Sequence, residues 1–185
     1  MYRSLSLALA CLVVVACERS PEVATAPSQA HGSHAALNSN GPISGQVQRE
    51  IARLRQVTAP FHDFQTAVAA GWGMAIPGCF SDPQLGGMGY HYGNAALIDG
   101  AVDVLEPELL VYEPQKNGKL RLVAVEYIVP FGAWTAAEPP KLYGQSFHRN
   151  EAFGLWVLHV WHFRHNPSGM FADWNPTVSC RFAAP

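Results

Sequence analysis

The stretch LRLVAVEYIV, from Leu120 to Val129, predicts the central strand of the fold. It is long, rich in β-branched residues and free of glycine and proline, as is typical of a strand buried in a sheet. Ideal alternation places Glu126 on the more apolar face of this strand. A lone carboxylate is costly there unless it is paired, bound to a metal or protonated. The neighbours that alternation predicts on that face are Leu120, Leu122, Ala124 and Ile128.

A second long strand is predicted from Phe153 to Arg164. Alternation makes His159 the only polar member of a face that otherwise carries aliphatic and aromatic side chains. Shorter strands are expected at Leu109–Tyr112 and at Gln145–His148, and the Asn117-Gly118 pair is typical of a hairpin turn. These segments favour a mainly antiparallel sheet.

Two helices are expected before the sheet. Apolar residues recur every three or four positions from Val47 to Val57, and Pro60 suits the first turn of a second helix that ends at Gly71. From Gly73 to Gly93 the chain is rich in glycine and predicts a loop region. The expected fold class is α+β, with two N-terminal helices packed on a mainly antiparallel, curved or barrel-like sheet, in one globular domain over residues 46–185.

Composition limits the classes of function. Of 185 residues, 49% are hydrophobic and 14% are charged, whereas about 25% charged is usual, so the chain can bury a core. A net charge of −2 provides no basic field for nucleic acid, so no nucleic-acid partner is expected. No Gly-x-Ser-x-Gly elbow and no phosphate-binding loop occurs in the chain, which gives no support to serine hydrolase or nucleotide chemistry.

The N-terminus has the pattern of an export signal. Arg3 precedes an apolar run from Leu5 to Val15 that is too short for a permanent membrane span. The run ends in Val-Val-Ala-Cys, with Cys17, which resembles the lipobox of bacterial lipoproteins and implies acylation of that cysteine. The expected organisation is a signal peptide at 1–16, a flexible tether at 17–45 attached to a membrane through lipid, and a domain outside the cytoplasm. An ordinary cleaved signal is the alternative.

The number of cysteines is also in keeping with a location outside the cytoplasm. After removal of the signal and acylation of Cys17, Cys79 and Cys180 remain, and an exported protein permits a disulfide between them. Such a bridge would close a loop of roughly 100 residues and stabilise the domain by about 4–5 kcal/mol on the chain-entropy model. Two thiolate metal ligands are the alternative.

Several segments of the domain resemble a group of uncharacterised exported bacterial proteins. They include Met88–Tyr92, Val125–Tyr127, His159–Trp161, Asn166–Phe171 and Trp174–Pro176, together with Pro107-Glu108. The resemblance implies export and supplies no activity.

Three residues form the candidate site. Glu126 and His159 interrupt apolar strand faces, and His91 lies in a Gly-rich segment where the backbone can approach a ligand closely. Imidazole and carboxylate suit one divalent transition metal, Zn, Fe, Mn or Cu, and three protein ligands leave a position for water or substrate. His148 is a substitute ligand. The sequence does not decide whether such a site is catalytic.

Other interpretations remain open. Glu126 and His159 could form a structural hydrogen-bonded pair in a non-enzymatic lipoprotein that binds a small ligand or a partner. Its pocket would be lined by aromatic side chains, drawn from Tyr90, Tyr92, Trp134, Trp156, Trp161, Phe171 and Trp174. His162 is expected to face away from His159, and His165 to lie in a turn. The sequence does not indicate an oligomeric state.

Overall fold

The computed structural model describes residues 43–184. The predicted signal peptide (1–16) and most of the predicted tether (17–45), including Cys17, lie outside these residues. Among the described residues, no helix is long and apolar enough to cross a membrane. The helical elements are α1 (Gly45–Thr58), η1 (Ala59–His62), α2 (Phe64–Ala69), η2 (Ala95–Leu97) and η3 (Phe131–Ala133).

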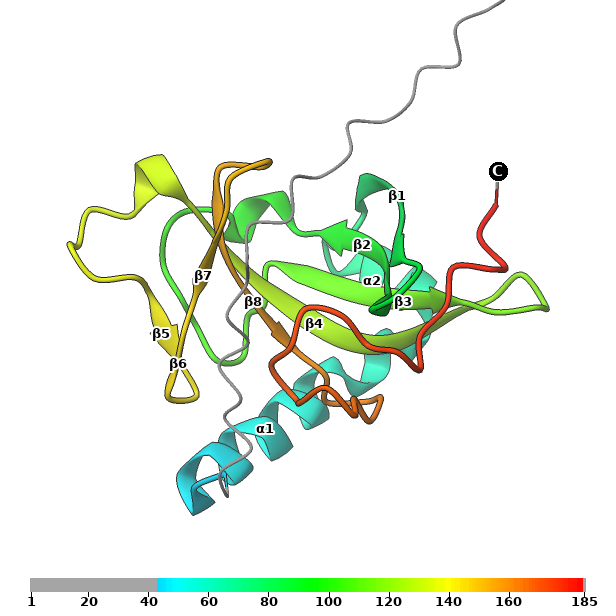
Figure 1. Ribbon diagram of the computed structural model, residues 1–185, viewed down its shortest axis with the longest axis horizontal. Coiled ribbons are helices and arrows are strands. Elements are labelled where there is room, and N and C mark those ends of the chain that lie inside the picture. Colours follow the sequence, from blue (N-terminus) through cyan, green and yellow to red (C-terminus); the bar gives the residue numbers. More distant parts are fainter. Residues whose placement is uncertain (1–42, 185) are drawn as a thin grey trace, which may run out of the picture. The chain divides into compact units, whose positions relative to one another are not determined.

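The fold is α+β, built on a curled antiparallel sheet of six strands in the order β1-β2-β3-β4-β8-β7 (Figure 1). A separate two-stranded ribbon pairs β5 with β6. The strands are β1 (Met74–Asp82), β2 (Gly86–Gly93), β3 (Leu109–Pro114), β4 (Leu120–Pro130), β5 (Lys141–Leu142), β6 (Gln145–Ser146), β7 (His148–Asn150) and β8 (Leu155–Val160).

The helices cover one face of the sheet. Ser44 caps α1 by accepting a hydrogen bond from Val47 N, and Asp63 caps α2 in the same way. Ile51 and Leu54 of α1 join Ala67 of α2 in the main core, packed against side chains of the central strands. The two predicted helices are therefore present, although Pro60 lies in η1 and α2 begins only after Asp63.

A β-bulge in β4 changes the predicted assignment of its faces. Val111 of β3 pairs with Ala124, but the next residue of β3 pairs with Leu122, so Val123 is the extra residue of a bulge. Before the bulge, Leu120 and Leu122 face the helices. After it, Val125, Tyr127 and Val129 do so. The prediction that Leu120 and Leu122 share a face with Glu126 was wrong, because the bulge reverses the alternation between them.

Three other strand predictions need correction. The Gly-rich segment expected to be a loop forms β1 and β2, in which glycines replace side chains where other backbone lies close. The second long strand begins at Leu155 and ends at Val160, well before Arg164. The short strand predicted at Gln145–His148 is divided between β6 and β7. The hairpin at Asn117-Gly118 is confirmed, with Gly118 at a φ of 75°.

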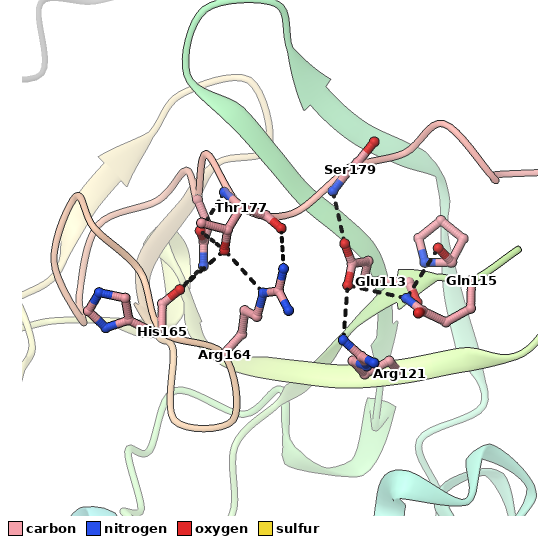
Figure 2. A network of polar contacts seen from close by, with 9 residues as sticks. Glu113, Gln115, Arg121, Arg164, His165, Thr177 and Ser179 are labelled. Carbon is pink, nitrogen blue, oxygen red and sulfur yellow. Dashed lines mark hydrogen bonds and ion pairs between the residues drawn. The ribbon is translucent and has the colours of Figure 1, made fainter.

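The C-terminal strap, which we define as residues 165–180, lies against the sheet. Its Phe171 packs on the helix-side core, whereas Val178 packs with Val111 and Val123 on the opposite face. Gly87 of β2 and Asn175 of the strap exchange two backbone hydrogen bonds. Figure 2 shows Glu113 of β3 between the strap and β4: its Oε1 accepts from Ser179 N at 3.2 Å, and its Oε2 lies 3.9 Å from Arg121 Nη1. These contacts hold the strap on the sheet without a helix or a regular strand.

A disulfide between Cys79 of β1 and Cys180 closes the strap, as the sequence predicts. Its sulfur atoms lie 2.02 Å apart, and the two cysteines are 101 residues apart in the chain. A bridge over so long a loop reduces the conformational freedom of the unfolded chain. It also connects the edge strand of the sheet to the last described segment of the protein.

Replacing Cys79 and Cys180 together by serine is expected to lower the free energy of unfolding by about 2–5 kcal/mol. Urea denaturation of the domain, followed by tryptophan fluorescence, measures the change. Reduction of the wild-type protein should give the same loss and should leave the double variant unaffected. Equal midpoints for oxidised wild type and the double variant would contradict the stabilising role of the bridge.

Candidate metal centre

The sheet register brings the three predicted residues together. Glu126 of β4 pairs directly with His159 of β8, and on its other side with Leu109 of β3. His91 of β2 pairs with Val111, two residues further along β3. Side chains of neighbouring strands that share a face and register lie close to one another. His91, Glu126 and His159 therefore meet on the face opposite the helices, although they are far apart in sequence.

Two distances from His91 Nε2 are close to those between ligand atoms in a metal site. His91 Nε2 lies 3.4 Å from Glu126 Oε2 and 3.4 Å from His159 Nε2. Ligand atoms around a tetrahedral ion with bonds of about 2.0–2.1 Å are separated by about 3.4 Å. One ligand atom from each of the three residues lies within 4.8 Å of the others. This buried group could hold one metal ion.

Burial determines the protonation of His91. Its side chain is 4% exposed, and burial, aided by the nearby His159, lowers its pKa to about 3. The imidazole is therefore neutral at pH 7, as a metal ligand must be. Within the described residues, His91 Nδ1 has no hydrogen-bond partner.

Glu126 and His159 shift each other's pKa in opposite directions. Burial raises the pKa of Glu126, and His159 opposes this shift. Burial alone would lower the pKa of His159, but the charges of Glu126 and Asp173 outweigh it and raise the pKa. Without a metal, the pair therefore favours a proton on His159 between two carboxylates. Glu126 Oε1 lies 3.7 Å from His159 Nδ1.

Asp173 is a fourth member of the site that the sequence analysis missed. Its Oδ1 lies 3.3 Å from His159 Nδ1, and its Oδ2 lies 3.0 Å from His148 Nε2. Burial would raise the pKa of Asp173, but His148 and His159 outweigh it and hold that pKa well below its usual range. One sequence feature could have indicated it, because Asp173 is the only acidic residue after Glu151.

His148 does not have the position predicted for a substitute ligand. It pairs with Asp173 at the edge strand β7 and is 35% exposed, whereas His91 and His159 are almost fully buried. The group of converging ligand atoms found among residues 43–184 contains His91, Glu126 and His159 without His148. The structure therefore assigns His148 to the periphery of the site.

A second buried carboxylate lies near the site. Glu108 precedes β3, is 2% exposed, and accepts a hydrogen bond from Ile128 N at 3.0 Å. Burial raises its pKa to about 8, so the side chain is largely protonated at pH 7. The side chain of Glu108 thus binds the backbone of β4 just beyond the point where the pairing of β3 with β4 begins. Its role is structural.

The glycines around His91 make room for protein and do not open a path to a ligand. A Cβ on Gly87 would lie 2.8 Å from Val178 O of the C-terminal strap. A Cβ on Gly89, at a φ of 110°, would lie 2.4 Å from Tyr112 O. The prediction that this segment lets a ligand approach is therefore corrected, because the strap and the adjacent strand fill the space.

Aromatic rings flank both histidines of the triad. The ring of Phe80 lies edge-on to His91 at 5.4 Å, and that of Trp161 lies parallel to His159 at 6.1 Å. Four of the aromatic residues predicted to line a pocket instead belong to the core or pack against it on the helix face of the sheet. These are Tyr92, Trp134, Trp156 and Phe171.

Two further histidines of the described residues, His162 and His165, have structural positions. His162 is 1% exposed and bonds through Nε2 to Thr58 Oγ1 at 2.9 Å, which connects α1 to the end of β8. It faces away from His159, as predicted. His165 is exposed, and its carbonyl accepts hydrogen bonds from Asn175 and Thr177, as expected of a turn residue.

Comparison with known proteins provides no independent assignment. No protein-family model matches the chain, and no curated protein or solved structure is significantly similar to it.

Acid is expected to destabilise the domain through His162. Burial lowers the pKa of His162 from 6.5 to about 4, so unfolding takes up a proton below pH 6.5. Its contribution is present above pH 6.5 and is lost as the pH falls towards 4. Between pH 7 and about pH 4.5, wild type should lose about 2 kcal/mol more stability than His162→Gln. Urea denaturation of metal-free protein at both pH values measures this, and equal losses in both proteins would contradict it.

Proposed function

We propose that the domain binds one divalent transition metal through His91, Glu126 and His159. The observation that carries this proposal is the 3.4 Å separation of His91 Nε2 from both Glu126 Oε2 and His159 Nε2. Two neutral imidazoles and a carboxylate suit Zn²⁺, Fe²⁺, Mn²⁺ or Cu²⁺. Three protein ligands leave a coordination position for water or a small molecule, which is the arrangement of a catalytic metal site.

Charge balance supports a divalent ion. When Glu126 and Asp173 are both ionised, two carboxylates lie close together in a buried region. Buried charges are costly unless a partner compensates them. A divalent ion at the triad would compensate the charge of Glu126 directly, and His148 faces Asp173 from the other side.

A structural pair remains the second candidate. Glu126 pairs directly with His159 on the adjacent strand. The carboxylate of Glu126 raises the pKa of His159, and His159 in turn opposes the rise in the pKa of Glu126. In this alternative the domain is a non-enzymatic binding module, and the polar group only fixes the sheet register. Metal content separates the two candidates.

Glu126→Gln is expected to weaken metal binding at least about tenfold, because the amide is a poorer ligand of nearly the same size. Calorimetric titration of the purified domain with Zn²⁺, Cu²⁺, Mn²⁺ and anaerobic Fe²⁺ measures the affinity. Glu108→Gln is the matched control, since Glu108 is a buried carboxylate of the same sheet outside the triad. It should bind metal as wild type does.

The structural candidate predicts a different result. Wild-type protein would bind none of the four ions, and Glu126→Gln would change only stability, by about 1–3 kcal/mol through an unsatisfied partner. That outcome would overturn the metal proposal.

We also propose that the protein is exported and held at a membrane by lipid on Cys17, with its domain outside the cytoplasm. The support is the N-terminal pattern of Arg3, the apolar run and the lipobox-like residues. The disulfide is in keeping with such a compartment. The partner that fits this proposal is a small molecule at the open metal position. A nucleic-acid partner does not fit it.

Cys17→Ser is expected to move the protein from the membrane fraction to the soluble fraction, because the thiol that carries the lipid is lost. Fractionation followed by mass analysis of the N-terminus measures the change. Cys79→Ser is the control and should remain with the membrane. A Cys17→Ser protein that is fully processed and still bound to the membrane would contradict lipid anchoring.

A further inference from the structure

We propose that Asp173 is a positioning residue of the metal centre, which holds the His159 ring with Nε2 towards the metal, and that the C-terminal strap serves to place it there. This inference rests on the proposed metal site and adds a residue that acts through His159. It explains why a segment without regular structure is fastened so closely over the sheet.

The two nitrogens of His159 have different neighbours. Nε2 lies 3.4 Å from His91 Nε2, where the metal would be shared, and Nδ1 lies 3.3 Å from Asp173 Oδ1. A neutral imidazole has one donor and one acceptor nitrogen, and the partner of the donor decides which nitrogen is left for the metal. A carboxylate at Nδ1 therefore leaves Nε2 free to ligate.

Asp173 also frees Glu126 for the metal. Glu126 Oε1 is the other acceptor near His159 Nδ1, at 3.7 Å. Asp173 Oδ1 is the closer of the two, at an ion-pair distance of 3.3 Å, and within the described residues neither it nor His159 Nδ1 forms a hydrogen bond. On this proposal Asp173 Oδ1 accepts the Nδ1 proton while Glu126 Oε2 faces His91. Without Asp173, Glu126 would be the remaining carboxylate near this proton, and its Oε1 would be drawn towards His159 Nδ1.

The carboxylate of Asp173 is itself held from the opposite side. His148 Nε2 lies 3.0 Å from Asp173 Oδ2, so an imidazole faces each carboxylate oxygen. Side-chain exposure falls from 35% at His148 to 17% at Asp173 and 2% at His159. The three side chains therefore form a line from the surface to the buried centre.

The strap fixes the backbone next to Asp173. Ala172 O accepts a hydrogen bond from Trp161 Nε1, and Met170 O accepts one from Trp161 N. The ring of Trp161 is in turn parallel to that of His159, with an angle of 11° between their planes. The strap thus contacts His159 through Asp173 and supports it through Trp161.

The test compares Zn²⁺ affinity in wild type, Asp173→Asn and Asp173→Ala, by competition with a chelator. Asp173→Ala is expected to lose about 10–100-fold in affinity, as is usual for carboxylates behind a ligating histidine. Asp173→Asn should lose less, because its amide oxygen still accepts the Nδ1 proton. Glu113→Gln is the matched control, a buried carboxylate that binds the strap at Ser179 N and contacts no member of the triad. Its affinity should stay within about threefold of wild type.

A spectroscopic readout separates positioning from simple support of the fold. In the Zn²⁺-loaded wild type, ¹⁵N NMR should show His159 protonated at Nδ1, and in Asp173→Ala this proton signal should weaken or move. Wild-type binding with unchanged affinity and an unchanged His159 signal in Asp173→Ala would overturn the role of Asp173 and leave the metal site standing. Wild-type protein that does not bind Zn²⁺ or any of the other three ions would overturn both.

Discussion

The pairing of Glu126 with His159 in the middle of the sheet is the constraint on which the rest of the site depends. A carboxylate at this position, with strands on either side, is largely removed from solvent, so it must be paired, bound to an ion or protonated. His91 lies next to Glu126, Asp173 lies next to His159, and His148 lies next to Asp173. The opposite face of the same strands carries an apolar core packed on two short helices, so the polar group is confined to one face.

The C-terminal strap gives this polar face its enclosure. If this face of the sheet were open to solvent, Glu126 and His159 would be hydrated, and the electrostatic interaction between them would be weak. Backbone hydrogen bonds to Gly87, the carboxylate of Glu113 and the disulfide hold the strap down instead. The glycines of β2 are required for this close approach, since a side chain at Gly87 would collide with Val178. Glycine here serves the packing of one backbone on another.

Glu126 and His159 could be selected from the sequence because each is a polar residue between apolar neighbours in a long strand pattern, although the neighbours assigned to the face of Glu126 were wrong before the bulge. The bulge at Val123 could not be predicted, since an extra valine among β-branched residues leaves the hydrophobic pattern unchanged. The strands β1 and β2 were missed because their glycines have low strand propensity and are tolerated only where other backbone fills the space. Asp173 lies in a segment with no period, so its position depends on tertiary contacts alone.

The order of the site residues along the chain has a consequence for assembly. His91 of β2 and the C-terminal strap are far apart in the chain, and the cysteines that join β1 to the strap are 101 residues apart. Contacts between such distant segments form late in folding, after the loops between them have closed. A partly folded chain thus has the histidines but lacks the geometry that brings them together. If the site binds an ion, as proposed, the ions abundant where folding finishes would decide which metal it binds.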